Sequence, residues 1–252
     1  MFDREAYEKR VKWFVHDRFG MFVHWELYAI PARGEWARST ERINKEDYQQ
    51  YFEEFNPVDY DPKLWAQLAK EAGMYNEVGR PVVWEACITM NNNRGYHSRD
   101  TFFKPAHMLI KKLVECVSKG GNMLLNVGPD AKGNIPEESV AILHSIGKWM
   151  RRNSESIYGC DISSLEKPDY GPITKNGNKL YYHVLDNPIG FIPLYGIQKE
   201  QVKKIRLLHT GAELHIINNW ICNNYKDIVF VSFGNNPVMP EETDTVIKVE
   251  LH

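Results

Sequence analysis

Residues 69–90, "AKEAGMYNEVGRPVVWEACITM", join the two kinds of element from which the first part of this chain is built. Before this segment, Asp61 can cap a helix that Pro62 opens, and apolar residues recur at helical spacing up to the stop at Gly73. After it, an apolar run beginning near Val82 is typical of a buried strand. Locally, the segment reads as a short connection from a helix to a strand.

The same alternation extends to both sides of this connection. The sequence predicts further strands at residues 19–25 and 122–127, and further helices at 45–55, 105–119 and 136–152. Strands that alternate with helices predict parallel pairing, and continuous apolar strands predict burial on both faces of the sheet. A closed (β/α)₈ barrel needs eight such units, and only three are clear here. We therefore expect an incomplete (β/α)₈-like barrel.

The pattern changes after about residue 160. Short β-type runs follow, separated by Gly, Asn, Pro and Asp: "KLYYHVL", "GFIPL", "KKIRLL", "ELHII", "DIVFVSF" and "TVIKVEL". Such runs are typical of a small β-sandwich. The predicted fold class is α/β plus all-β, with a barrel-type domain over residues 1–160 and a C-terminal β-sandwich over residues 161–252.

Composition excludes several classes of protein. The 252 residues are 43% hydrophobic and 25% charged, with a formal charge of −2, so neither a nucleic-acid groove nor a membrane-binding patch is expected. No run approaches the roughly 18 apolar residues of a membrane span. The N-terminus "MFDREAYEKRVKWF" lacks an apolar signal core, and the four cysteines form no C-x-x-C pair. We expect a cytoplasmic protein with reduced thiols, no metal and no cofactor.

Polar residues at the strand ends are the candidates for chemistry. Glu85 lies in an apolar strand beside Trp84, where desolvation would favour its protonated form, as a general acid requires; an ion pair with a basic side chain is the alternative. His24 could bind a hydroxyl-rich ligand or be a core histidine. Trp25, Trp36 and Trp84 could each stack on a sugar or pack in the core.

A sugar hydrolase normally needs two carboxylates that flank the scissile bond. Glu85 is one candidate. The possible second carboxylates are Glu26, Glu35, Asp100 and Asp130. "GGNMLLNVGPD" lacks the spacing of a phosphate loop, so nucleotide binding is not expected.

Several of these segments resemble one enzyme family. "WFVHDRFGMFVHWELYAIPARGEWARS", "GRPVVWEACITMNNNRGY" and "LVECVSKGGNMLLNVGPDAKGNIP" are similar to segments of α-L-fucosidases, glycoside hydrolase family 29. The resemblance implies a (β/α)₈-like barrel followed by a β-sandwich. It also implies retaining hydrolysis of terminal α-L-fucose from a fucosylated oligosaccharide or glycoconjugate, without a metal.

The resemblance also suggests roles for single residues. Glu85 matches the acid/base of the branch that acts on α-1,3/1,4-linked fucose, and His24 resembles a fucose-binding histidine. Glu35 and Trp36 fall in a loop that lines the family's pocket. Two positions depart from the family: Glu26 replaces a Gly after His-Trp, and Arg94 replaces an aromatic before Gly-Tyr.

A larger departure follows "AKEAGM". The family's His-His-Asp-Gly segment and the strand that carries its nucleophilic Asp are absent, which predicts an internal deletion near Met74-Tyr75 and leaves the nucleophile unknown. Three hypotheses follow. The chain is an impaired fucosidase, or an active one whose site a homo-oligomer completes, or a carbohydrate-binding or assembly module without catalysis.

Overall fold

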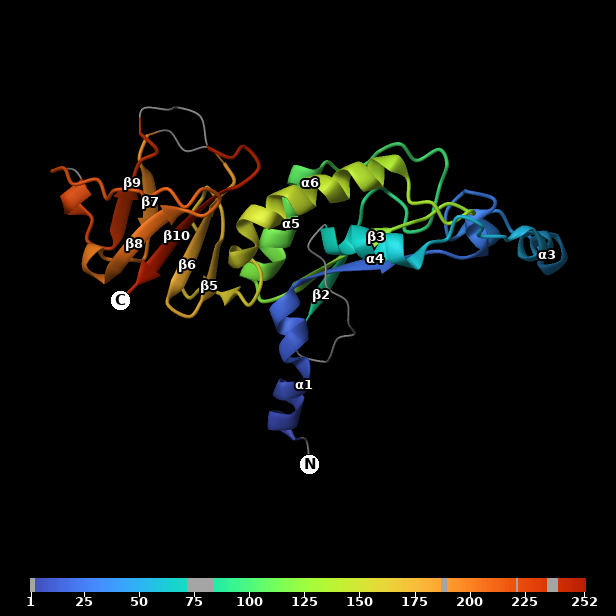
Figure 1. Cartoon of the computed structure of the whole chain (residues 1–252), viewed down its shortest axis with the longest axis horizontal. Coiled ribbons are helices and arrows are strands. Elements are labelled where there is room, and N and C mark those ends of the chain that lie inside the picture. The colour runs from blue at the N-terminus through green and yellow to red at the C-terminus, as the bar shows by residue number, and fades with distance from the viewer. Residues whose placement is uncertain (1–2, 72–83, 187–189, 221, 235–239) are drawn as a thin grey trace.

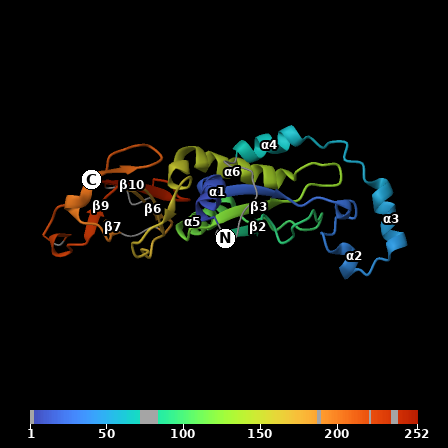
Figure 2. The ribbon, with the colours of Figure 1, turned by 90° about the horizontal axis from the view of Figure 1, so that it is seen from below.

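The protein has two parts that lie side by side along its long axis (Figure 1). The structure, a computed structural model, describes residues 3–71, 84–186, 190–220, 222–234 and 240–252. An α/β part comes first and a β part follows, as Figure 2 shows from below. The predicted junction near Met74-Tyr75 lies outside the described residues.

A parallel three-stranded sheet forms the centre of the α/β part. Its strands are β1 (Phe19–Val23), β2 (Glu85–Thr89) and β3 (Asn122–Val127), in the order β1-β3-β2. β3 pairs in parallel with both neighbours. The predicted parallel pairing is confirmed, and the carboxyl ends of all three strands therefore meet at one edge of the sheet.

Six helices are described in the α/β part: α1 (Arg4–Asp17), α2 (Ala37–Thr40), α3 (Lys45–Glu54), α4 (Pro62–Glu71), α5 (Ala106–Ser118) and α6 (Glu137–Asn153). The predicted helices agree with α3, α4, α5 and α6 to within a residue or two. The sequence patterns did not predict α1. Asp3 caps it, with its Oδ1 accepting from the N–H of Ala6 at 3.0 Å.

The sheet is covered on one face. Side chains alternate between the two faces of a strand, and those of Met123, Leu125 and Val127 pack in the core with α5 and α6. On the other face, which we call the open face, Phe22 is 38% exposed, and Cys87 is also exposed. The expectation of burial on both faces is therefore wrong for β1 and β2, whereas the central strand β3 has buried residues on both faces.

Two antiparallel sheets form the β part. One contains β4 (Asp161–Ile162), β5 (Ile173–Asn176), β6 (Lys179–Val184), β10 (Thr245–Leu251) and β8 (Val202–Leu207), in that order. The other pairs β7 (Ile192–Tyr195) with β9 (Ile228–Val231). Buried residues of both sheets share one hydrophobic cluster, as in a sandwich. The predicted strand "ELHII" is wrong, since only isolated bridges occur there.

The two parts share buried structure. Tyr181 and Val246, from β6 and β10, belong to the same hydrophobic core as α5 and α6. Arg18 is 1% exposed and donates to the carbonyl oxygens of Cys160 at 3.0 Å and Gly120 at 2.8 Å. The proposed domain boundary at residues 160 and 161 stays a prediction, and the contacts across it are extensive.

A hydroxyl–imidazole–carboxylate series is also buried where the parts meet. Thr174 Oγ1 lies 3.1 Å from His183 Nε2, and His183 Nδ1 lies 2.7 Å from Asp244 Oδ2. All three residues are 0% exposed, and the Thr174 hydroxyl donates to the carbonyl of Ser156 at 2.8 Å. Because no substrate can reach a fully buried hydroxyl, this series links the two parts and is not a catalytic triad.

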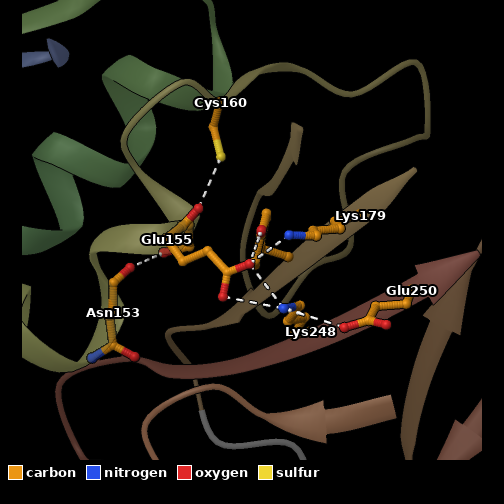
Figure 3. A network of polar contacts seen from close by, with 8 residues as sticks. Asn153, Glu155, Cys160, Lys179, Lys248 and Glu250 are labelled. Carbon is orange, nitrogen blue, oxygen red and sulfur yellow. Dashed lines mark hydrogen bonds and ion pairs between the residues drawn. The ribbon is translucent and has the colours of Figure 1, made fainter. Parts of the chain in front are cut away.

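Glu155 forms a second polar link between the parts (Figure 3). It lies just after α6 and accepts from Lys248 at 2.8 Å, Lys179 at 3.0 Å and the hydroxyl of Tyr181 at 3.0 Å. Burial raises the pKa of Glu155, but the hydrogen bonds from both lysines and Tyr181 outweigh this effect and lower the pKa to about 2. The carboxylate is therefore ionised whenever the protein is folded above about pH 2.

We expect Glu155→Gln to reduce the pH dependence of stability. The folded pKa of about 2 lies below the ordinary value of 4.5, so ionised Glu155 stabilises the fold above pH 4.5 and this contribution is lost as the pH falls toward 2. The side chain is 40% exposed, so solvent screening limits the effect to on the order of 1 kcal/mol. Urea unfolding at pH 7 and pH 3 measures it.

Glu115 provides a matched control. Its pKa is also lowered to about 2, by hydrogen bonds from Lys112 and Lys119, but these partners lie on or next to the same helix, α5. Helical pairs of this kind contribute about 0.3–0.5 kcal/mol each. If Glu115→Gln lowered the free energy of unfolding more than Glu155→Gln did, the proposed importance of the Glu155 link would be contradicted.

Candidate functional site

The carboxyl ends of the three strands carry the polar groups from which a site can be built. The N–H of His24, just after β1, donates to the carbonyl of Val127 at the end of β3 with a length of 3.0 Å. Asn126 is 2% exposed and its Nδ2 donates to the carbonyl of Arg94 at 2.7 Å. This bond holds the loop that follows β2 across the end of β3.

Two glycines allow the loop to pack closely. A Cβ at Gly128 would lie 2.9 Å from backbone atoms of Arg94, Gly95 and Tyr96. A Cβ at Gly95 would lie 2.3 Å from the ring of Tyr28. Both distances are too short for a real Cβ, so any larger residue would force the backbone or the ring to move.

This loop fixes one carboxylate. The N–H of Gly95 donates to Glu35 Oε2 at 3.0 Å, and the N–H of Gly34 donates to the carbonyl of Tyr96 at 3.1 Å. Burial, followed by the nearby carboxylates of Glu26 and Glu35, raises the pKa of Tyr28 well above its ordinary value. Tyr28 is therefore a neutral phenol beside Glu35, with its ring centroid 6.0 Å from that of His24.

Unsatisfied polar atoms lie in the same region. His24 Nδ1 and Asn126 Oδ1 are buried and have no hydrogen-bond partner among the described residues. Phe22, His24 and Asn126 lie on the open face, and the rings of Phe22 and His24 are 5.2 Å apart. Trp36 is 66% exposed next to Glu35. The arrangement suits a ligand that offers a hydroxyl group to the Glu35 carboxylate and an apolar face to Trp36.

Glu85 does not lie with these residues. It is the first residue of β2 and pairs with Asn122 at the amino end of β3, whereas His24 follows the carboxyl end of β1. Glu85 lies beside Asn122 and His24 lies beside Val127, so five residues along β3 separate them, which corresponds to about 16 Å. Glu85 is also exposed, so the buried environment expected for it is wrong. Its assignment as the acid/base stays a prediction that this geometry does not favour.

The other carboxylates considered as partners have local structural contacts. Asp100 accepts from the N–H of Asn92 and the amide of Asn93; burial raises its pKa, but these bonds and one from Phe102 N–H outweigh that and lower it. Asp130 accepts from backbone N–H groups of its own turn. Glu26 is exposed. Of these carboxylates, Glu35 has the environment most suited to ligand binding.

Trp25 and Trp84 have structural roles. Trp25 packs in an aromatic cluster with Phe55, Tyr60 and Trp65, and its Nε1 donates to the carbonyl of Asp130 at 2.7 Å. Trp84 lies at the amino end of β2, where its Nε1 donates to the carbonyl of Lys119 at 3.2 Å. Trp36 is therefore the tryptophan of the three that remains exposed beside the candidate site.

Neither a metal centre nor a membrane-spanning helix is found in the part of the chain that the structure describes. No group of three His, Cys, Asp or Glu side chains there could hold a metal ion. No helix there is long and apolar enough to cross a membrane. A cavity of about 110 Å³ lies behind the loop after β2, lined by Asn126, Tyr96 and Ser139 among others. Drug-sized ligands need roughly 300 Å³ or more, so this cavity is too small for one.

Comparison with known proteins assigns the family. The family model described as "Alpha-L-fucosidase" matches residues 2–78 and 75–155, more than half of the chain. The chain belongs to the α-L-fucosidase family. The glycosidase and fucose-related terms that the sequence suggested are thereby confirmed, whereas neither the α-1,3/1,4 branch nor the internal deletion is tested by these matches.

Individual relatives agree with this family assignment. An α-L-fucosidase of Dictyostelium discoideum is 41% identical over 111 residues, which are 42% of this chain and 24% of the relative. The solved α-L-fucosidase isoenzyme 1 from Paenibacillus thiaminolyticus has a TM-score of 0.91 at 32% identity, covering 98% of this chain and 100% of that chain. An α-L-fucosidase of Bacteroides thetaiotaomicron, solved as a trapped covalent intermediate with 2-fluoro-fucosyl fluoride in a Glu-to-Gln mutant, has a TM-score of 0.84 at 19% identity, covering 97% and 96%.

The chain spans about a quarter of the length of the first curated α-L-fucosidases that it matches. The similarity to the Bacteroides structure, at 19% identity, supports the fold alone. The activity of a whole α-L-fucosidase is therefore only proposed for this chain.

Sequence patterns missed two residues of the site. Tyr28 and Gly95 link His24 to Glu35, yet neither attracted attention because a buried tyrosine and a loop glycine are common. The sequence "RGY" at residues 94–96 contained a signal, since a glycine beside an aromatic residue often marks a close backbone approach.

Proposed function

We propose that this α-L-fucosidase-family chain recognises terminal α-L-fucose of fucosylated glycans at the carboxyl edge of its sheet, and that its own hydrolytic activity is impaired. The observation that carries the proposal is Glu35, which the N–H of Gly95 holds at 3.0 Å beside exposed Trp36. The α-1,3/1,4-linked class of substrate is part of the same proposal.

Each residue has a distinct role in binding. The Glu35 carboxylate has one oxygen held by Gly95 and accepts from a sugar hydroxyl through the other. His24, which is partly exposed, hydrogen-bonds a second hydroxyl through its ring. Trp36 packs on the apolar C–H face of the sugar. Arg94 is exposed, in a position where an aromatic side chain would have added to this packing.

Impairment follows from the number of carboxylates. Retaining hydrolysis uses a nucleophile and an acid/base about 5 Å apart. The Bacteroides relative was trapped as a covalent intermediate, which supports the same double displacement for the family. In the described part of this chain, Glu85 lies at the other end of the sheet, and Asp100 and Asp130 are engaged by backbone N–H groups. The remaining candidate, Glu26, acts on Tyr28 together with Glu35 but is exposed, unlike the shielded acid/base that this reaction uses.

An internal deletion near Met74-Tyr75 is the proposed reason why the chain lacks a pair of catalytic carboxylates. The family model matches in two pieces, 2–78 and 75–155, which meet beside that position. The strand order β1-β3-β2 is compatible with one arc of a barrel whose intervening strand–helix units are missing.

The proposal predicts binding without turnover. We expect purified chain to bind L-fucose in calorimetry and to leave an aryl α-L-fucoside unhydrolysed. Glu35→Gln removes a charge-assisted hydrogen bond and should weaken binding about tenfold. The exposed Glu166→Gln, in the β part, is the control and should bind as the wild type does. Turnover that Glu85→Gln abolishes would contradict the proposal, and so would wild-type fucose binding by Glu35→Gln.

Completion of the site by a second copy is the alternative, which the open face favours. Strands β1 and β2 are the outer strands of the sheet, and unpaired strand edges promote association. This alternative predicts a dimer in light scattering and an aryl-fucosidase activity that rises with protein concentration. A monomer without activity at every concentration rules it out.

A further inference from the structure

A groove on the β-sandwich, far along the chain from the fucose-binding residues, has the chemistry of a second ligand site. It has a volume of about 350 Å³ and lies between the segment around the short 3₁₀ turn Lys199–Gln201, the segment 216–218 and strand β9. That volume falls within the roughly 300–1,000 Å³ of small-molecule sites. The candidate is therefore large enough for one or two sugar rings.

The groove has an aromatic wall whose orientation is fixed. Tyr225 is 51% exposed, and its ring contacts Phe230 edge-on with centroids 5.7 Å apart. The carbonyl of Phe230 accepts from the N–H of Ile217 at 2.8 Å. This bond holds the segment 216–218, which also lines the groove, against strand β9. A partly exposed ring that is held by packing can stack on a ligand with little loss of conformational entropy.

Polar groups lie around this aromatic wall. Asn218, Lys199, Glu200 and Lys226 line the groove and are exposed. Gln198 is rigid, because its Nε2 donates to Asp227 Oδ1 at 2.9 Å and it also forms a capping box with Gln201. Amide, ammonium and carboxylate groups together donate to and accept from hydroxyl groups, which a purely apolar or singly charged groove could not do.

A second exposed aromatic residue lies on the same segment. Trp220 is 78% exposed, five residues before Tyr225. Tryptophan is highly buried on average, so two exposed rings within one short segment need an explanation. Sugar rings supply one, because they present an apolar C–H face to an aromatic ring and a rim of hydroxyl groups to amides and charges.

We propose that this groove binds a neutral hexopyranose unit of a glycan, with Tyr225 stacking on the sugar and Asn218 hydrogen-bonding its hydroxyl groups. This site is separate from the one built around Glu35. Ligand binding at each of the two sites can therefore be tested independently of the other.

Binding of sugars without fucose tests the proposal. Lactose, cellobiose and N-acetyllactosamine are titrated into the full chain by calorimetry up to about 50 mM, and we expect at least one to bind with a millimolar Kd. Tyr225→Ala should weaken that binding about tenfold, and Trp220→Ala should weaken it less. Both side chains are exposed, so the variants should fold, which circular dichroism checks.

Two controls separate this groove from other surfaces. Phe191→Ala removes another exposed aromatic ring of the β part, 45% exposed and outside the groove, and should leave disaccharide binding unchanged. Trp36→Ala should reduce L-fucose binding and leave disaccharide binding unchanged. The proposal is overturned if none of the three disaccharides binds, if Tyr225→Ala binds as the wild type does, or if Trp36→Ala abolishes disaccharide binding.

Discussion

Asp244→Ala is expected to lower the free energy of unfolding by about 3 kcal/mol. His183 Nδ1 lies 2.7 Å from Asp244 Oδ2, and both side chains are 0% exposed. Removing the carboxylate leaves a buried ring N–H without its acceptor and opens a cavity beside it, because water does not reach either group. Urea unfolding at pH 7, followed by circular dichroism, measures the change.

Two further variants make this result specific. Asp244→Asn keeps an acceptor oxygen of similar size and should cost only about 1 kcal/mol. His144 and Glu71 form the same type of pair at 3.4 Å, but with side chains 56% and 37% exposed, so Glu71→Ala should cost less than about 1 kcal/mol. Equal losses for Asp244→Ala and Glu71→Ala would show that burial of the His183 pair contributes nothing.

Gly128→Ala should disrupt the fucose-binding site. Its new Cβ would lie 2.9 Å from backbone atoms of Arg94, Gly95 and Tyr96, so the loop must move. Movement breaks the hydrogen bond from Gly95 N–H to Glu35, and overpacking of this kind costs about 1–3 kcal/mol of stability. We expect calorimetry to show at least a tenfold loss of L-fucose affinity, together with a lower urea midpoint.

Gly177→Ala controls for loss of stability alone. Gly177 has a φ of +58°, so alanine is strained there by roughly 1 kcal/mol, but its added Cβ meets no atom within 4 Å. This variant should be destabilised and should still bind L-fucose normally. If Gly128→Ala also bound normally, the loop would not position Glu35 as proposed.

Local patterns predicted most elements of the fold. The spacing of apolar residues gave α5, α6 and β3 nearly to the residue, because each buries one stripe or one run of side chains in a core that lies close by. Helix α1 was missed because, of its side chains whose burial the structure describes, only those of Tyr7, Val11 and Phe14 are buried, among charged neighbours. The apolar stripe of α1 is too narrow to be recognised from the spacing of apolar residues in the sequence.

The open face could not have been anticipated from the same patterns. An apolar strand indicates that burial suits its residues, but whether a second layer covers them depends on other parts of the chain. Glu85 illustrates a related limit. An apolar run that begins near Val82 places Glu85 within a strand, whereas the described strand begins at Glu85 itself, and this shift of a few residues moves the carboxylate to the amino edge.

The candidate site depended on contacts between distant residues. Glu35 meets Gly95 across 60 positions, and Asn126 meets Arg94 across 32. Family resemblance selected His24, Glu35 and Trp36, and the structure places them at one edge of the sheet. Neither periodicity nor resemblance indicated Thr174, His183 and Asp244, whose meeting depends on the pairing of three separate segments of the β part.

The pairing of β1 with β3 has a consequence for how the chain folds. Phe19 pairs with Met123, about 100 residues later, so among the described strands the first has no partner until the third has been made. At a synthesis rate of roughly 5–20 residues per second, β1 waits about 5 to 20 seconds on the ribosome. Its apolar residues are exposed during that time, and a parallel pair so distant in sequence also closes slowly. Chaperone dependence during synthesis is the expected consequence of this strand order.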